Sequence, residues 1–137
     1  MRRNSIPAIL LAFVFAFGCA SKGAHPVEVS DSDICSYCKM AISEKQYAAE
    51  FFDSEGEVYK FDEIGCMRNF VARAQIRPTA VFVKDFESRT WLDGKQAVYV
   101  RSEKFNTPMN GQITAFKDNR AAQAAAAKFD GTLVPLW

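Results

Sequence analysis

Histidine is almost absent from this sequence, which has one in 137 residues. Metal sites built from several imidazoles are therefore excluded. No Ser-His-acid set, glycine-rich phosphate loop or nucleotide motif is recognisable, so we expect no enzymatic activity. An excess of charge is also lacking, because 17 Lys and Arg side chains stand against 16 Asp and Glu side chains. A near-neutral chain has no basic field for a phosphate backbone, so we expect no nucleic-acid partner.

The sequence contains no apolar run long enough to read as a membrane span. The run Ile6–Phe17 covers about 12 residues, whereas a helix needs roughly 20 to cross the hydrocarbon core. It follows Arg2 and Arg3 and ends beside Cys19, in a pattern that resembles a bacterial lipobox. We predict that residues 1–18 are a lipoprotein signal peptide and that Cys19 becomes the lipidated N-terminus. The alternative is an ordinary secretory signal with an incidental cysteine.

Residues 19–32 show no sustained apolar period and are predicted to form a flexible tether. Such a tether would hold the remaining residues, 33–137, near the periplasmic face of the outer membrane, since no acidic retention residue follows Cys19. The single histidine, His25, lies in this tether. A lone histidine there is more often solvated than metal-bound, so we keep His25 as a weak candidate ligand.

The rest of the chain contains the pattern of strands and helices twice. The first copy has strand candidates at 46–52 and 57–61, an Asp62-capped helix from Glu63 to about Ala74, and a strand at 80–83. The second has strand candidates at 91–92, 97–100 and 112–116, a helix capped by Asp118 or Asn119 that runs to Lys128, and a strand at 132–136. We predict an α+β fold of two similar ββαβ units, about 46–85 and 91–136, in one compact pseudo-symmetric module. The core face of the first helix is predicted to comprise Ile64, Met67, Phe70, Val71 and Ala74.

Soft metal ligands are concentrated between Cys35 and Met40. Two thiols, Cys35 and Cys38, and the Met40 thioether fall within six residues. Zinc prefers four tetrahedral ligands, often two cysteine pairs, and the sequence contains no such arrangement, so we disfavour structural zinc. Thiolate together with thioether suits Cu(I), which a site with few protein ligands can release by ligand exchange. The pattern favours a Cu(I) carrier.

Two further segments carry sulfur. Met109 lies in a loop at 106–111, bounded by proline and glycine, and it becomes a candidate ligand because of the cysteine cluster. Cys66 lies in the predicted first helix, where packing accounts for it adequately, and we rank it as a weak candidate.

A thiol-disulfide oxidoreductase is the main alternative, with Cys35 and Cys38 cycling between dithiol and disulfide. Against it, the pair precedes a predicted hairpin instead of opening a helix, so no helix dipole would activate a nucleophile. A passive copper buffer or sensor is a third possibility, and the sequence does not separate it from a carrier with a client.

Taken together, the motifs resemble those of the NosL family of outer-membrane lipoprotein copper chaperones. The resemblance covers essentially the whole chain after the signal peptide. It rests on a lipobox-type cysteine, on the Cys-x-x-Cys-x-Met element, and on three later elements in the same order: Tyr59-Lys-Phe-Asp62 with Gly65-Cys66-Met67, Val83-Lys-Asp85 with Trp91, and Thr107-Pro-Met109. It implies a pair of ββαβ units.

The resemblance also implies ligands and partners. Family members supply Cu(I) to nitrous oxide reductase and work with the ABC transporter that matures it. The implied copper ligands fall on Cys38, Met40 and Met109, with Cys35 as a further possibility. The family commonly has glycine where this chain has Lys39, which leaves the conformation of the Cys38–Met40 turn open.

Overall fold

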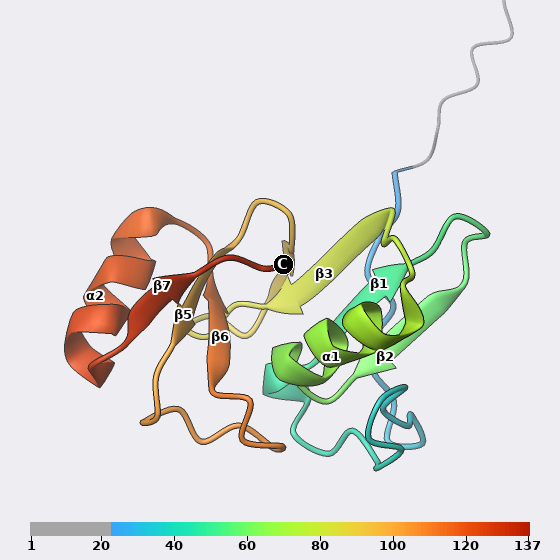
Figure 1. The fold of residues 1–137 in the computed structure, drawn as a ribbon, viewed down its shortest axis with the longest axis horizontal. Helices are drawn as coiled ribbons and strands as arrows, with labels where there is room; N and C mark the ends of the chain where they lie inside the picture. Colours follow the sequence, from blue (N-terminus) through green and yellow to red (C-terminus); the bar gives the residue numbers. More distant parts are fainter. Residues whose placement is uncertain (1–22) are drawn as a thin grey trace, which may run out of the picture.

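The computed structural model describes residues 23–137, so the predicted signal peptide and Cys19 lie outside it. These residues form two β-sheets side by side, each accompanied by one helix (Figure 1). Within residues 23–137, no helix combines the length and apolar character that crossing a membrane requires.

The first sheet is antiparallel, with the strand order β2-β1-β3-β4. Its elements are, in chain order, the short 3-10 helix η1 (Lys45–Tyr47), β1 (Ala49–Phe52), β2 (Val58–Phe61), α1 (Ile64–Ala74), β3 (Ala80–Lys84) and β4 (Trp91–Asp93). Asp53 makes the turn between β1 and β2, since its Oδ1 accepts hydrogen bonds from the backbone N–H groups of Glu55 and Glu57, both at 2.9 Å.

The second sheet is also antiparallel, with the order β6-β5-β7. Its elements are β5 (Val98–Arg101), β6 (Ile113–Phe116), α2 (Asn119–Phe129) and β7 (Thr132–Val134). Asp118 caps α2, because its carboxylate accepts a hydrogen bond from the backbone N–H of Ala121 at 2.8 Å.

The two units share one topology, which confirms the α+β class and the paired ββαβ units. In each, the first strand is central, the second strand lies on one side, and the strand after the helix lies on the other. Phe61 and Phe116 end corresponding strands, and an 11-residue helix follows each. Both helices end at a left-handed residue, Gln75 or Asp130.

Trp91 and Leu92 differ from the prediction. They belong to β4, which pairs with β3 at the edge of the first sheet, instead of starting the second unit. The reason is the tight turn after β3: Asp85 N–H donates to the Thr90 carbonyl at 2.8 Å, and the Asp85 carboxylate accepts hydrogen bonds from Ser88. That turn folds the chain straight back onto β3.

Several element ends also differ from the predicted ones. The predicted strand at 46–52 starts only at Ala49, because Tyr47 N–H bonds to the Glu44 carbonyl in η1. The last strand stops before Pro135, which has no N–H for a sheet. Ala74 is exposed and does not belong to the core, since the buried residues of α1 lie in its first turn.

Aromatic side chains dominate both cores. In the first, the Phe51 ring stacks on Tyr59 and Phe61 with centroids 4.9 and 5.6 Å apart. In the second, rings from separate elements pack around Phe86, which comes from the β3–β4 turn and lies 5.6 Å from Phe116. The Phe86 N–H also donates to the Ala115 carbonyl at 2.9 Å. The β3–β4 turn therefore joins the two units.

The segment before the cysteines is bound to the first sheet, where we expected a flexible tether. Val27 N–H donates to Glu50 Oε1 at 2.7 Å, and Trp91 Nε1 donates to Glu28 Oε1 at 3.0 Å. Val29 is buried. Glu50 is fully buried in β1, and its Oε2 has no hydrogen-bond partner. Burial raises the pKa of Glu50.

We predict that Glu50→Gln flattens the dependence of stability on pH. A raised pKa means that the folded state binds this proton more tightly, so the resulting stability is complete below the ordinary value of 4.5 and falls as pH rises through the folded-state pKa. Glutamine keeps an oxygen acceptor for Val27 N–H and does not ionise. In urea denaturation, wild type should lose up to about 1.4 kcal/mol per pH unit relative to Glu50→Gln above pH 4.5. The control is Glu55→Gln, on the exposed turn; parallel profiles for wild type and Glu50→Gln would contradict the prediction.

Candidate metal centre

The segment from Cys35 to Met40 forms a tight turn closed by backbone hydrogen bonds. Cys35 N–H donates to the Met40 carbonyl at 2.8 Å, and Lys39 N–H donates to the Cys35 carbonyl at 3.0 Å. Ile34 and Ala41 pair just outside the turn. Lys39 has φ of 63°, the left-handed conformation that glycine adopts at least cost. The turn thus takes the form that suits glycine, although lysine occupies it.

Four potential metal ligands meet between this turn and the start of α1. The Sγ atoms of Cys35, Cys38 and Cys66 and a carboxylate oxygen of Asp62 all lie within 4.8 Å of one another. Asp62 follows β2, and Cys66 lies four residues later in the first turn of α1. Cys35, Asp62 and Cys66 are buried, with exposed fractions of 0, 3 and 2%, whereas Cys38 is half-buried. We call these four residues the thiol cluster.

Hydrogen bonds within the thiol cluster make its sulfurs unequal. The Cys66 thiol donates to Cys35, which lowers the pKa of Cys35 to about 6 and raises the pKa of Cys66. Burial raises the pKa of Cys38 to about 11. Cys38 Sγ donates to Asp62 Oδ2 at 3.5 Å, and Asp62 Oδ1 is buried without a partner. The cluster therefore contains a thiol poised to ionise and an unsatisfied carboxylate oxygen.

The loop that carries Met109 is attached next to the thiol cluster by Glu63. This buried residue precedes α1, and its Oε2 accepts hydrogen bonds from the backbone N–H groups of Met109 at 3.1 Å and Gly111 at 3.4 Å. The backbones meet closely there: a Cβ added to Gly65 would lie 3.0 Å from Gly111 Cα. Two glycines thus allow the loop of the second unit to approach α1 of the first.

The three copper ligands implied by the family resemblance lie on the two segments that border α1. Cys38 belongs to the thiol cluster, and Met40 ends the same turn. Met109 lies on the loop held by Glu63. Met40 and Met109 are 57 and 44% exposed, unusually high for methionine, so both thioethers are accessible to solvent.

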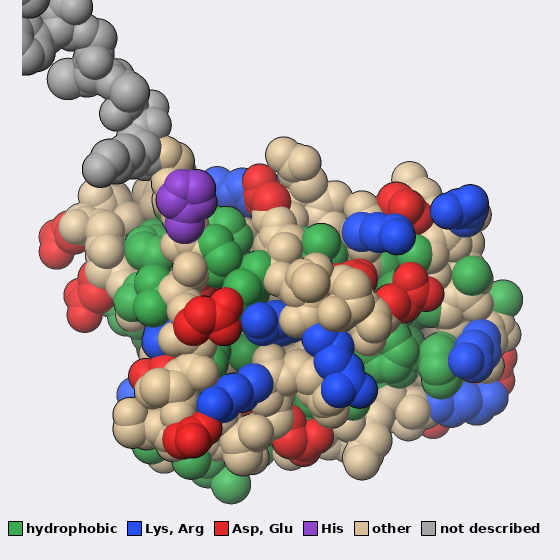
Figure 2. Space-filling view, turned by 180° about the vertical axis from the view of Figure 1, so that it is seen from behind, with side chains coloured by type: hydrophobic (Ala, Val, Ile, Leu, Met, Phe, Trp, Pro, Cys, Tyr) green, Lys and Arg blue, Asp and Glu red, His purple; other side chains and the backbone are tan. Residues whose placement is uncertain are grey.

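His25 lies apart from the grouped ligands. It is exposed, and Figure 2 shows it at the surface close to the point where the undescribed residues begin. Within residues 23–137, the group of side chains close enough to share a metal ion does not include it.

Asp62 and Cys66 have a larger part in the site than the sequence pattern indicated. We assigned Asp62 to capping α1, but Glu63 is the N-cap residue and Asp62 contacts Cys38 instead. The spacing of four residues between Asp62 and Cys66 would have placed both on one side of the helix start. The usual zinc arrangements considered from the sequence do not include a group of three cysteines and one aspartate, and the fold assembles such a group from residues distant in the chain.

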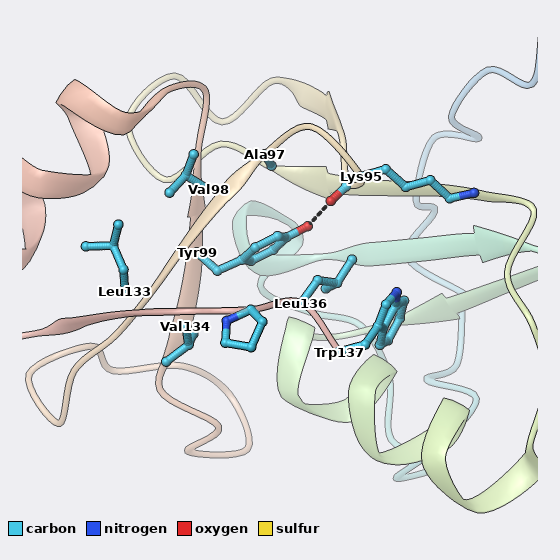
Figure 3. A pocket seen from close by; sticks show the side chains of 10 residues that line it. Lys95, Ala97, Val98, Tyr99, Leu133, Val134, Leu136 and Trp137 are labelled. Atoms are coloured by element: carbon cyan, nitrogen blue, oxygen red, sulfur yellow. Dashed lines mark hydrogen bonds between the residues drawn. The ribbon is translucent and has the colours of Figure 1, made fainter.

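A separate groove lies where the C-terminal segment crosses the second unit. It has a volume of about 620 Å³, and Tyr99, Leu133 and Trp137 contribute to its lining (Figure 3). The Tyr99 hydroxyl donates to the Gly94 carbonyl at 2.5 Å. The groove contains no thiol or carboxylate side chain, so the metal chemistry of the described residues belongs to the thiol cluster and the adjoining methionine loops.

Comparison with known proteins agrees with this architecture. The family model described as NosL matches residues 26–136. The crystal structure of the copper chaperone NosL from Shewanella denitrificans superimposes with a TM-score of 0.73 at 17% sequence identity, covering 80% of this chain and 91% of that chain. At this identity the match establishes a shared fold. No curated protein matches the chain significantly.

We predict that Gly111→Ala destabilises the protein by about 2 kcal/mol, because the new methyl group would overlap Glu63 Oε1 and push the Met109 loop from α1. Chemical denaturation measures this effect. Gly23→Ala is the matched control, since a Cβ there meets nothing within 4 Å. Equal unfolding free energies for the two variants would mean that the loop is not held against Glu63.

Proposed function

Because the chain belongs to the NosL family, we propose that it is a copper chaperone, which binds Cu(I) as cargo and passes it to a client protein. The observation that carries this proposal is the meeting of three cysteine sulfurs and Asp62 at the start of α1, bordered by two exposed methionines. Thiolate and thioether sulfur are the ligands that soft Cu(I) prefers.

We assign the entry and exit of copper to Cys38, Met40 and Met109. Cys38 is the most accessible of the three described cysteines, and both thioethers are open to a partner protein. Neutral thioethers bind Cu(I) without adding negative charge, so a partner's sulfur ligand can replace them one at a time. Such stepwise exchange moves the ion without exposing it to water.

The burial and pKa of the cysteines favour this role over thiol-disulfide exchange. An oxidoreductase needs an accessible thiolate that attacks a partner's disulfide. Cys38 is the more accessible thiol of the pair, but burial raises its pKa to about 11. Cys35, with the lowered pKa, is completely buried. The pair lies in a turn and does not open a helix, so no helix dipole supports a nucleophile.

For the client and location, the proposal rests on the family resemblance and on the N-terminal sequence. We propose that copper is delivered for assembly of nitrous oxide reductase, in cooperation with its maturation ABC transporter. We also propose that a lipid on Cys19 anchors the protein to the periplasmic face of the outer membrane. A lipid anchor would concentrate the carrier in the compartment where its client matures.

Cys38→Ser should lower Cu(I) affinity by at least about 100-fold, because the variant loses a thiolate that both binds and neutralises the ion. Met40→Leu and Met109→Leu should lower affinity by about tenfold or less and slow the transfer of copper to apo-nitrous oxide reductase. Anaerobic titration against a competing Cu(I) chelator measures affinity, and stopped-flow mixing with the client measures transfer.

Met67→Leu is the matched control, since Met67 is fully buried and absent from the thiol cluster. Tight Cu(I) binding by wild type without transfer to the client would favour the passive buffer. No Cu(I) binding by the reduced protein, or no loss in Cys38→Ser, would refute the proposed function.

Cys19→Ser should release the protein from the membrane, because the lipid is its proposed anchor and a serine is not lipidated. After expression in a two-membrane bacterium, wild type should fractionate with outer membranes and the variant with soluble periplasmic proteins. Mass spectrometry of the wild-type N-terminus provides the control. A soluble wild type with an unmodified N-terminus would show that the export signal is an ordinary one.

A further inference from the structure

We propose that Cys35 and Cys66, together with Cys38, form an inner thiolate site in which Cu(I) rests after capture at the exposed position. This inference builds on the proposed copper-carrier function and divides the site into two positions that share Cys38. At the outer position, Cys38 works with Met40 and Met109. At the inner position, the two buried cysteines replace the thioethers.

The spacing of the sulfur atoms supports the inner position. All three Sγ atoms and an Asp62 oxygen already lie within 4.8 Å of one another, so small side-chain rotations would bring them around one ion. The sulfurs come from two hydrogen-bonded elements. Cys35 lies in a turn closed by the Met40 carbonyl, and Cys66 lies in α1. Little chain order has to be gained when copper binds.

A buried and unsatisfied oxygen favours a bound ion at the inner position. Asp62 is 3% exposed, and its Oδ1 lacks any partner. The neighbouring Glu63 is also buried. Among residues 23–137, no ion pair or hydrogen bond joins Asp62 or Glu63 to a lysine or arginine. A buried carboxylate oxygen without a partner is costly, and a metal ion bound within the thiol cluster would give it one.

Movement between the positions is a ligand exchange in which copper stays Cu(I). Bonds from copper to the Met40 and Met109 sulfurs break, and bonds to the Cys35 and Cys66 sulfurs form, while the bond to Cys38 is kept. Each thiol that binds copper loses its proton. Cys38 releases its proton to solvent when copper is captured at the outer position, and Cys35 and Cys66 release theirs to solvent as copper moves inward.

The outer and inner positions differ in how fast they exchange copper and how tightly they hold it. The thioethers of the outer position are exposed and neutral, so they exchange readily with a partner. The inner position supplies more anionic sulfur and excludes water, so it holds copper more tightly. Affinity should therefore depend on Cys35 and Cys66, and exchange rate on Met40 and Met109.

Three variants of the full chain test this inference under anaerobic, reducing conditions, with Cu(I) as the probe. The double variant Met40→Leu/Met109→Leu should keep one Cu(I) within about tenfold of wild-type affinity, because three thiols remain. Cys35→Ser and Cys66→Ser should each lower affinity by about 100-fold. X-ray absorption of the one-copper forms should show fewer sulfur neighbours in both serine variants than in the double methionine variant.

Met67→Leu is the matched control for Cys66→Ser, because it alters the next buried residue of α1 without removing a cluster ligand. The two methionines of the double variant are exposed, so that test stands even where a serine variant fails to fold. Asp62→Asn adds a test of the unpartnered oxygen: the copper-free variant should have a higher denaturation midpoint than wild type, yet bind Cu(I) more weakly, because an amide oxygen is a weaker metal ligand than a carboxylate oxygen.

Loss of copper from the double methionine variant would overturn the inner site, as would wild-type affinity and sulfur count in a folded Cys35→Ser or Cys66→Ser protein. Neither result would refute the carrier function, which fails only when wild type does not bind Cu(I) or Cys38→Ser binds it unchanged. Failure of wild type to pass copper to the client would count against the chaperone and leave the inner site in place.

Discussion

The carboxylate of Glu63 holds the parts of the candidate metal centre together. It lies between Asp62, a member of the thiol cluster, and the first residue of α1, and it accepts hydrogen bonds from the Met109 loop. A hydrogen bond to a charged group in a buried place contributes about 1.5–3 kcal/mol, more than a bond between neutral groups. One side chain thereby sets the spacing between sulfur-bearing segments that are distant in the sequence.

The residue immediately before the helix has a different role in the second unit. Asp118 also stands in extended conformation immediately before a helix, but its shorter side chain bonds to its own helix at Ala121. Glu63 makes no such bond and reaches the other unit. Counting from these caps, Lys117 stands where the first unit has Asp62, and Ala121 where it has Cys66. The two units therefore share a fold, while the metal-binding residues belong chiefly to one of them.

Local patterns in the sequence predicted the repeated strand, turn and helix order, because strand alternation, the Asp53 turn and the Asp118 cap depend on neighbouring residues. Contacts between distant residues were not predictable in this way. The pairing of β4 with β3 and the binding of Val27 to Glu50 depend on which surfaces meet after folding. Secondary-structure propensity does not specify which distant surfaces come into contact.

The candidate metal centre shows the same difference between local patterns, which the sequence reveals, and long-range contacts, which it does not. Cysteine and methionine spacing pointed to soft-metal chemistry, and the fold brings Cys35 and Cys38 together with a third thiol. Asp62 misled us because an aspartate before a helix is a frequent cap, and here the cap position falls one residue later. A single-residue shift redirects that carboxylate from the helix backbone to the sulfurs.

Lys39 has a consequence for the entropy of the metal-binding turn. Its left-handed backbone costs a lysine about 1 kcal/mol that glycine would not incur. Glycine, however, would sample many more conformations before the chain folds, and lysine samples fewer. The strain and the reduced freedom act in opposite directions on the free energy of folding, and the hydrogen bonds from Cys35 N–H to the Met40 carbonyl and from Lys39 N–H to the Cys35 carbonyl close the turn. In this chain, backbone hydrogen bonds close the metal-binding turn with a lysine at its left-handed position.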